Sequence, residues 1–167
     1  MRTVFDPLQK AVYAHGGFIT TSAGDAFAAV FPANDLSAAE RSLAAAWSIR
    51  EYLASHCEQE ARYGSFPIGV KLGLAYGEAQ WGIVQSDDEE RATYYFRGAA
   101  IDAAAGAEKT AEPRNLVITP AAFREIGELA SGEWVDDHLR VIALHVDILG
   151  WERTAIAHRQ HAVISGH

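Results

Sequence analysis

Residues 18–31 read FITTSAGDAFAAVF, in which two short strand-like runs, residues 18–23 and 26–31, flank Gly24-Asp25. Glycine and aspartate both tolerate positive φ values, so this pair favours the tight turn of a β-hairpin. The stretch therefore predicts two antiparallel strands with Asp25 at the exposed tip between them.

Helical periodicity is present on both sides of this hairpin. Before it, residues 4–14 place apolar side chains on one helical face, and the Gly16-Gly17 pair then ends the helix. After it, residues 37–56 carry apolar and alanine side chains at helical spacing, and Ser37 with Glu40 forms a capping-box pattern. We therefore expect one helix before the hairpin and a long core-packing helix after it.

The remainder of the chain predicts strands separated by single helices. The expected elements are strands over 67–76 and 79–84 that pair as a hairpin around Gly77-Glu78, a loop over 86–91, a helix over 99–111, a strand over 115–119, a helix from Pro120 and a final strand over 139–149. Hairpins that alternate with single helices indicate an α+β, ferredoxin-like sandwich with one mostly antiparallel sheet. The chain of 167 residues has the usual size of one domain, and we assign residues 1–167 to it.

Composition and charge exclude several classes of protein. The chain is 49% hydrophobic and 22% charged, as expected of a folded protein and not of a disordered one. Its formal net charge of -8 argues against nucleic-acid binding, because such affinity comes largely from Lys and Arg that neutralise phosphates. Cys57 is the only cysteine, so neither an intrachain disulfide nor a thiolate metal cluster can form. The absence of a signal peptide or a membrane-spanning run predicts a soluble, cytoplasmic chain.

Three stretches in this order resemble class III adenylate and guanylate cyclases of a divergent bacterial type. Residues 14–17, 22–25 and 28–32 resemble the helix end, Gly-Gly turn and metal-bearing Gly-Asp hairpin of that family. Residues 68–78 resemble the family's next hairpin, and residues 94–102 resemble the strand and glycine that open its active-site helix. The resemblance implies the nucleotide cyclase fold.

The resemblance also implies a reaction and a cofactor. In this family the 3′-hydroxyl of ATP or GTP attacks its own α-phosphate, so that a cyclic nucleotide forms and pyrophosphate leaves. Charge neutralisation by Mg²⁺ or Mn²⁺ and donors to the phosphates support this transfer. The resemblance covers roughly residues 4–120 and assigns one metal-binding carboxylate to Asp25, with Gly24 beside it for close approach of the phosphates. On local sequence alone, a plain hairpin-turn role is the simpler interpretation of Asp25.

By the same resemblance, a second metal carboxylate belongs on a strand ahead of the first helix, and this chain starts too late to contain it there. Residues 139–151, LRVIALHVDILGW, resemble that strand instead and carry Asp147 inside an apolar run. Because an unpaired buried carboxylate is very costly, a buried Asp147 needs a cation or hydrogen-bond donors. If Asp147 binds metal, the domain is circularly permuted, exchanged between chains or cut from a tandem pair. The alternative is an ordinary last strand with Asp147 facing water.

At the positions where the family has its nucleotide-binding and catalytic residues, this chain carries different residues. Thr21 and Tyr95 occupy the two purine-reading positions. Asp102 replaces a ribose-orienting Asn, and Gly106 replaces the Arg that stabilises transition-state charge. Loss of a guanidinium removes a charge-assisted contact, and an added carboxylate repels a triphosphate. No residue is therefore assigned as catalytic.

A nucleotide would contact Thr21, Gly24, Tyr95, Arg97 and Asp102 if the resemblance holds. Arg97 precedes the helix start, where phosphate can bind, although a solvated strand-end residue is its simpler interpretation.

The family residues that are replaced in this chain belong to one half of the two-domain site. In the family, one domain gives the metal carboxylates and a second gives the base, ribose and transition-state contacts, and this chain keeps candidates for the first set only. We expect a nucleotide cyclase domain that is weak or inactive alone and acts as the metal-bearing half of a dimer with a complementary cyclase domain, or of a tandem pair in one polypeptide. A homodimer is the other expected partner arrangement, but self-sufficient catalysis by it is not expected. An inactive regulatory or dimerisation module is the second interpretation, and a chance resemblance on a ferredoxin-like fold is the third.

Overall fold

The computed structural model describes residues 2–33, 37–61, 64–85 and 92–145. The helices are α1 (Arg2–Ala14), α2 (Ala38–Ser55), α3 (Ala99–Thr110) and α4 (Pro120–Ile126), which continues into a short 3-10 turn, Gly127–Leu129. The strands are β1 (Phe18–Ala23), β2 (Ala26–Val30), β3 (Glu58–Ala61), β4 (Gly64–Pro67), β5 (Leu72–Leu74), β6 (Gln80–Gln85), β7 (Ala92–Arg97), β8 (Leu116–Ile118), β9 (Ala130–Val135) and β10 (His138–Leu144). Every helix expected from the sequence is present.

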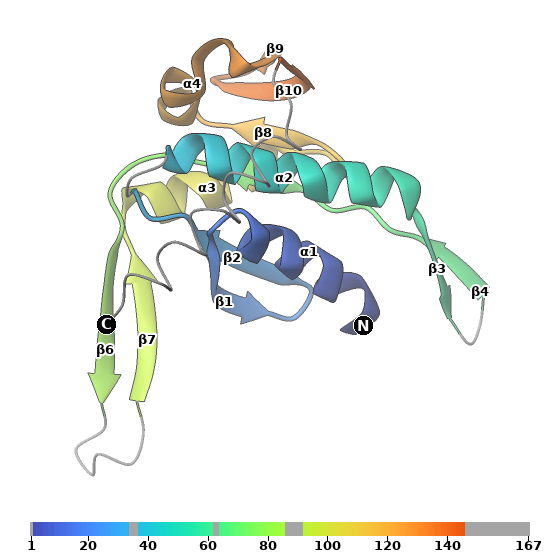
Figure 1. Cartoon of the computed structure of the whole chain (residues 1–167), viewed down its shortest axis with the longest axis horizontal. Helices are drawn as coiled ribbons and strands as arrows, with labels where there is room; N and C mark the ends of the chain where they lie inside the picture. Colours follow the sequence, from blue (N-terminus) through green and yellow to red (C-terminus); the bar gives the residue numbers. More distant parts are fainter. Residues whose placement is uncertain (1, 34–36, 62–63, 86–91, 146–167) are drawn as a thin grey trace, which may run out of the picture.

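The main sheet contains four strands in the order β5-β8-β10-β9, and three two-stranded ribbons, β1–β2, β3–β4 and β6–β7, form separate pairs. All of these pairs are antiparallel except β5 with β8. In Figure 1, α2 lies between α1 and the β8, β9 and β10 strands, while the β6–β7 ribbon extends away from the body. The predicted α+β class is confirmed, although the single sheet expected from the sequence is divided within the described residues.

Helix α2 is the centre of the core and buries two of its sides. Its N-cap, Ser37, accepts a hydrogen bond from the Glu40 amide at 3.2 Å, as the capping-box pattern predicts. One side packs with the sheet and α4 in a cluster of Ala39, Leu43, Ala46, Leu74, Leu116, Ile118, Ala122, Ile126, Ala130, Leu139 and Val141. The other side packs with α1 in a cluster of Leu8, Val12, Ile49 and Leu53. Each buried Leu or Ile contributes roughly 1.5–3 kcal/mol, so α2 joins α1 and the sheet into one core.

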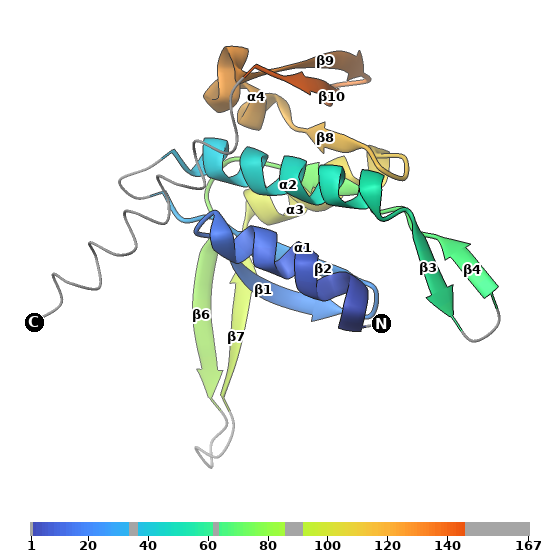
Figure 2. The same cartoon turned by 45° about the vertical axis from the view of Figure 1, so that its right-hand side comes forward.

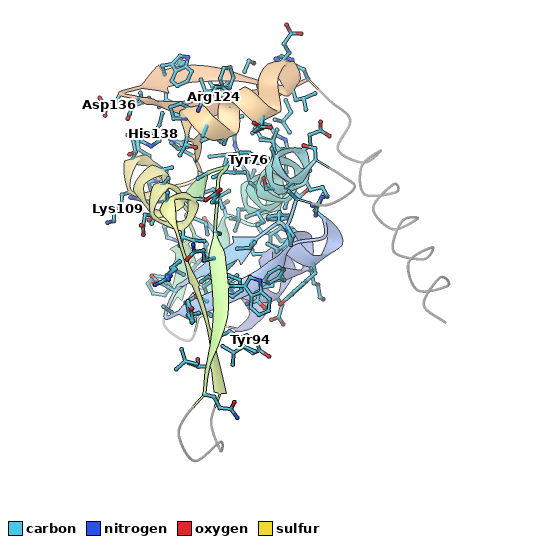
Figure 3. All side chains as sticks on the ribbon, turned by 90° about the vertical axis from the view of Figure 1, so that its left-hand side faces the viewer. Tyr76, Tyr94, Lys109, Arg124, Asp136 and His138 are labelled. Carbon is cyan, nitrogen blue, oxygen red and sulfur yellow. The ribbon has the colours of Figure 1, made fainter. Side chains whose placement is uncertain are left out.

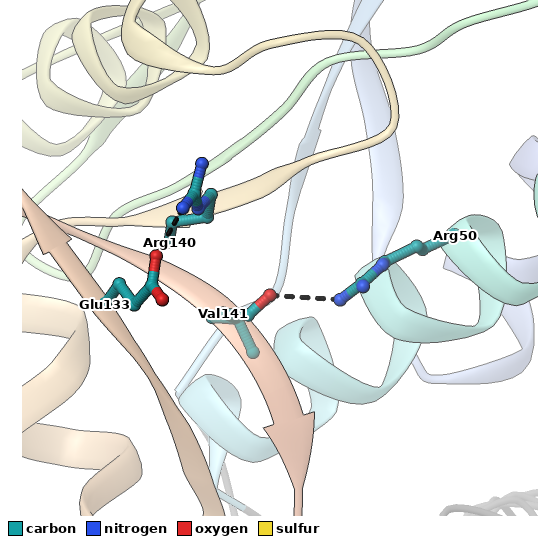
Figure 4. A network of polar contacts seen from close by, with 4 residues as sticks. All are labelled: Arg50, Glu133, Arg140 and Val141. Carbon is teal, nitrogen blue, oxygen red and sulfur yellow. Dashed lines mark hydrogen bonds and ion pairs between the residues drawn. The ribbon is translucent and has the colours of Figure 1, made fainter.

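Polar contacts fasten the C-terminal half of α2 to strand β10. Arg50 donates from Nη1 to the carbonyl oxygen of Val141 at 3.0 Å, and its guanidinium lies 4.3 Å from the centre of the Trp47 ring. Figure 4 shows this bond beside the ion pair between Arg140 of β10 and Glu133 of β9. The helix is therefore held to the sheet by a directional contact in addition to its apolar face.

Arg41, near the start of α2, is a buried charged residue that joins two distant segments. Its guanidinium donates to the carbonyl oxygens of His15 at 3.4 Å and Gly16 at 3.2 Å, which follow the end of α1. It also donates to the carbonyl oxygen of Pro32, just after β2. Burial lowers the pKa of Arg41 from its ordinary value. The carbonyls of His15 and Gly16 precede β1, and the carbonyl of Pro32 follows β2. Arg41 therefore holds the base of the β1–β2 ribbon against α2.

The predicted hairpin of residues 67–76 and 79–84 is wrong. Strand β5 pairs in parallel with β8, and β6 pairs with β7. The residues expected in the turn contact the start of helix α3, where the Ala100 amide donates to the carbonyl oxygen of Glu78 at 3.4 Å. Gly77, with φ +154°, turns the chain at this point, and a side chain on Gly98 would come within 2.7 Å of the Glu78 oxygen. Contact with α3 therefore replaces the hairpin turn.

Two further differences from the sequence analysis concern strands. The β3–β4 ribbon and strand β9 were not expected; β9 forms an antiparallel pair with β10, and the register of this pair shifts between Val141 and Ala143. The predicted last strand over 139–149 corresponds to β10, which begins one residue earlier, at His138. Its final residues, and the loop expected over 86–91, lie outside the described part of the chain. No helix in the described part has the length and apolar character needed to cross a membrane.

Candidate functional site

The candidate metal-binding residue Asp25 lies at the tip of the β1–β2 ribbon, where the sequence places it. Ala23 pairs with Ala26 across the turn, and Gly24 has φ +62° while Asp25 does not have a positive φ. A positive φ at the first central residue alone is the pattern of a type II′ turn, for which glycine is the preferred residue. Asp25 is exposed, and a side chain built on Gly24 would meet no atom within 4 Å. The Asp25 carboxylate is therefore accessible, and the Gly24 backbone is unobstructed where a side chain would project.

A β-bulge lies between this tip and the base of the ribbon. The register shifts between Ile19 and Thr21, so that Thr20 is the extra residue in β1. The Thr20 hydroxyl donates to the carbonyl oxygen of Ala28 at 3.3 Å. Bulges increase the local twist and change the direction of neighbouring side chains, and they are frequent beside active sites. Thr21, the candidate purine-contacting residue, follows the bulge directly and is exposed.

A second group of candidate residues lies where β7 meets α3. Tyr95 and Arg97 are exposed on β7, and the Arg97 guanidinium lies 5.8 Å from the centre of the Tyr95 ring. Arg97 also donates from Nε to Oε1 of Gln80 on the paired strand, at 3.3 Å. These contacts keep Arg97 on its own ribbon, which agrees with its simpler interpretation as a solvated strand-end residue.

The two altered family positions follow on helix α3. Asp102 is exposed in the first turn, where a carboxylate is favoured by the helix dipole whatever its role in binding. Gly106 lies about one turn further on, and a side chain built there would meet no atom within 4 Å. The structure therefore leaves room for a Cβ atom at position 106, although the chain carries a glycine there.

These two groups do not come together within one chain. The base of the β1–β2 ribbon contacts the β7–α3 junction through Phe18 and Phe96, whose ring centres are 5.8 Å apart. Asp25 lies at the other end of the ribbon, roughly 20 Å away at about 3.3 Å per strand residue. Figures 1 and 2 show the β1–β2 ribbon running toward the side of the N-terminus, away from the start of α3 at the end of β7. The chain thus presents two separate partial sites.

The donor set at Asp25 fits only part of a metal site. Among the described residues, no group of three or more His, Cys, Asp or Glu side chains could hold a metal ion. Mg²⁺ is commonly held by one or two carboxylates together with water and substrate phosphates. Asp25 could supply one such oxygen, and a second carboxylate would have to come from elsewhere. Asp147, the candidate for that role, lies outside the described residues.

The sequence matches no protein-family model, and no curated protein sequence is detectably similar to it. Solved structures do match. The guanylate cyclase domain of RhGC from Catenaria anguillulae, in complex with GTP, has a TM-score of 0.72 at 17% identity over 86% of this chain and 81% of that chain.

Two further solved structures have the same fold. The non-canonical dimeric guanylyl cyclase domain of the RhoGC fusion protein from Blastocladiella emersonii has a TM-score of 0.69 at 18% identity, over 84% of this chain and 78% of that one. The adenylyl cyclase CyaB from P. aeruginosa has a TM-score of 0.66 at 14% identity, over 87% and 82% respectively. The structural neighbours are guanylyl and adenylyl cyclase domains, and the fold of this chain is the nucleotide cyclase catalytic fold.

The sequence analysis missed one surface feature, a row of exposed apolar side chains on the β6–β7 ribbon. Trp81 and Ile83 alternate with Gln80 and Gly82 along β6, which is the signal of a strand with one apolar face. Because β6 was assigned to the wrong partner strand, the matching apolar residues of β7 were not placed beside it.

Proposed function

We propose that this chain is a nucleotide cyclase domain of cyclic-nucleotide signalling that is inactive or weak alone and supplies the metal-binding half of a two-domain site. The observation that carries the proposal is Asp25, an exposed carboxylate beside an unobstructed glycine at the tip of a β-hairpin, in a domain with the cyclase fold. A carboxylate there can hold Mg²⁺ or Mn²⁺ against the phosphates of ATP or GTP.

The residues on α3 support dependence on a partner. In the reaction, the bond from the 3′-oxygen to the α-phosphorus forms while the bond to pyrophosphate breaks, and negative charge develops on the phosphate oxygens. Gly106 offers no donor to that charge, and Asp102 adds a like charge near the triphosphate. A complementary cyclase domain that has Asn and Arg at these positions would supply both contacts.

The test measures cyclic nucleotide formation by an equimolar mixture of this chain and such a complementary domain, whose own metal carboxylates have been replaced. We expect Mn²⁺-dependent product from the mixture, and at least about a 100-fold loss when Asp25→Asn removes the metal ligand. Asp136→Asn is the matched control, because Asp136 is also an exposed aspartate in a hairpin turn. Equal turnover by the Asp25→Asn and wild-type mixtures would refute the proposal.

The second candidate function is an inactive regulatory or dimerisation module with this fold. It is favoured by the atypical residues Thr21, Tyr95, Asp102 and Gly106. Calorimetric titration with ATP or GTP in the presence of Mn²⁺ separates the two candidates. Micromolar affinity that disappears in Asp25→Asn supports the metal-binding half-site, whereas no heat of binding by the wild-type chain or its mixture supports the inactive module.

A further inference from the structure

The β1–β2 ribbon is held in a fixed register at both of its ends. At the base, Arg41 binds carbonyl oxygens before and after the ribbon, and Ile19 packs against the cluster between α1 and α2. At the tip, Ala23 pairs with Ala26 around Gly24, whose φ of +62° suits the tight turn. Each end therefore decides which residues of the two strands lie opposite one another near it.

The two ends do not fit one regular register. Near the base, Ile19 lies opposite Ala29, and at the tip Ala23 lies opposite Ala26. Four steps along β1 thus correspond to three steps along β2, so one residue of β1 has no residue directly opposite it. The shift in register identifies that residue as Thr20, which forms a β-bulge. The bulge reconciles the anchored base with the anchored tip.

The bulge decides which face of the ribbon each neighbouring side chain occupies. In a regular strand, Ile19 and Thr21 would lie on the same face, because side chains alternate. Directly opposed residues share a face. Ile19 lies opposite Ala29, and both pack against the cluster between α1 and α2, whereas Thr21 lies opposite Ala28, and both are exposed. The bulge therefore keeps Ile19 in the core and turns Thr21, the candidate purine-contacting residue, to the outside.

The Thr20 side chain itself fastens the bulge. Its hydroxyl donates to the carbonyl oxygen of Ala28, the residue opposite Thr21, at 3.3 Å. A bulge bends its strand and increases the local twist, so the part of the ribbon beyond it, including Asp25, takes its direction from this point. The hydrogen bond is exposed, and water can replace it at little cost in stability. The geometry at Thr20 can therefore be changed without disturbing the core.

We propose that Thr20 is a positioning residue of the nucleotide site: its bulge turns Thr21 outward and sets the direction in which the tip presents Asp25 to the metal and the phosphates. This inference rests on the proposed function, in which Asp25 holds Mg²⁺ or Mn²⁺. Thr20 touches neither the metal nor the nucleotide in this role and acts through the direction of the ribbon. A displacement of about 1 Å at a reacting centre can cost about 100-fold in rate, so a change in twist several residues away has a measurable effect.

The test deletes Thr20. The deletion should leave the other paired residues of the ribbon, the turn at Gly24 and the contacts of Arg41 in place, while it removes the extra residue and its twist. In the mixture with the complementary cyclase domain, we expect turnover at saturating nucleotide to fall at least about 10-fold and the half-saturating Mn²⁺ concentration to rise at least about threefold. The urea midpoint of the chain alone should stay close to that of wild type. A merely structural role of Thr20 would not change the Mn²⁺ requirement.

Two substitutions separate the hydroxyl from the rest of the side chain, and they decide the question if the deletion variant does not fold. Thr20→Ser keeps the donor to Ala28 and should stay within about threefold of wild type, whereas Thr20→Val removes it and should turn over at least about fivefold more slowly than Thr20→Ser. Thr110→Val is the matched control, because the Thr110 hydroxyl also donates to a backbone carbonyl oxygen, that of Gly106, at 3.2 Å. Thr110 lies on α3, next to Lys109, which Figure 3 labels, and its substitution should leave the Mn²⁺ requirement unchanged.

The possible results separate the inference from the function on which it rests. Unchanged turnover and an unchanged Mn²⁺ requirement in the deletion variant would overturn the inference and leave the proposed function standing. Equal turnover by Thr20→Val and Thr20→Ser would overturn it as well. A wild-type mixture that forms no cyclic nucleotide and shows no Mn²⁺-dependent binding of ATP or GTP would instead refute the proposed function, and the role of Thr20 with it.

Discussion

At the residue scale, we expect Arg41 to contribute strongly to the free energy of unfolding. It is buried and donates to carbonyl oxygens of His15, Gly16 and Pro32, so its removal leaves several backbone acceptors without their charged donor. We expect Arg41→Met to lower the free energy of unfolding by about 2–4 kcal/mol, measured by urea denaturation. Arg124→Met, at an exposed position on α4, should stay within about 0.5 kcal/mol of wild type. A similar loss in the free energy of unfolding in both variants would contradict this role of Arg41.

At the same scale, the sequence predicts the hairpin tip well and the remaining site poorly. The position of Gly24-Asp25 depends on the turn preferences of two adjacent residues, which are local and can be read directly. The bulge at Thr20 depends on strand register, which no local pattern of Thr20-Thr21 reveals. The role of Asp147 depends on which segments lie beside it, and so it stays a prediction.

At the element scale, Gly73 allows strand β5 to make a close backbone contact with helix α3. A side chain on Gly73 of β5 would lie 2.3 Å from the carbonyl oxygen of Ala104 and 2.4 Å from the amide nitrogen of Glu108. Gly73→Ala must therefore push α3 away, and we expect thermal or urea unfolding to show a loss of about 2–3 kcal/mol.

Gly106→Ala is the control for this contact, since Gly106 belongs to the same helix and faces open space. Replacement of a helical glycine by alanine should raise the free energy of unfolding by about 0.5–1 kcal/mol. The close packing of α3 on β5 would be excluded if Gly73→Ala were as stable as Gly106→Ala.

The helices could be predicted from the sequence more fully than the pairing of the strands. The helices follow from periodicity and caps within one segment, such as Ser37 before α2 and Thr119 before α4. Strand β5 has three residues and pairs with β8, more than forty positions away, so its partner is set by tertiary contacts. A sequence pattern with two strands around Gly77 favours a local hairpin, whereas in the structure β5 pairs with β8, β6 pairs with β7 and the start of α3 contacts Glu78.

At the scale of the whole molecule, the candidate residues lie in two separate places, the β1–β2 tip with Asp25 and the start of α3. Under the proposed function, each place would supply part of what cyclase chemistry requires, so a second domain would have to complete the site. Two identical chains would still lack a guanidinium at position 106, so a homodimer should catalyse poorly even if its two copies come together.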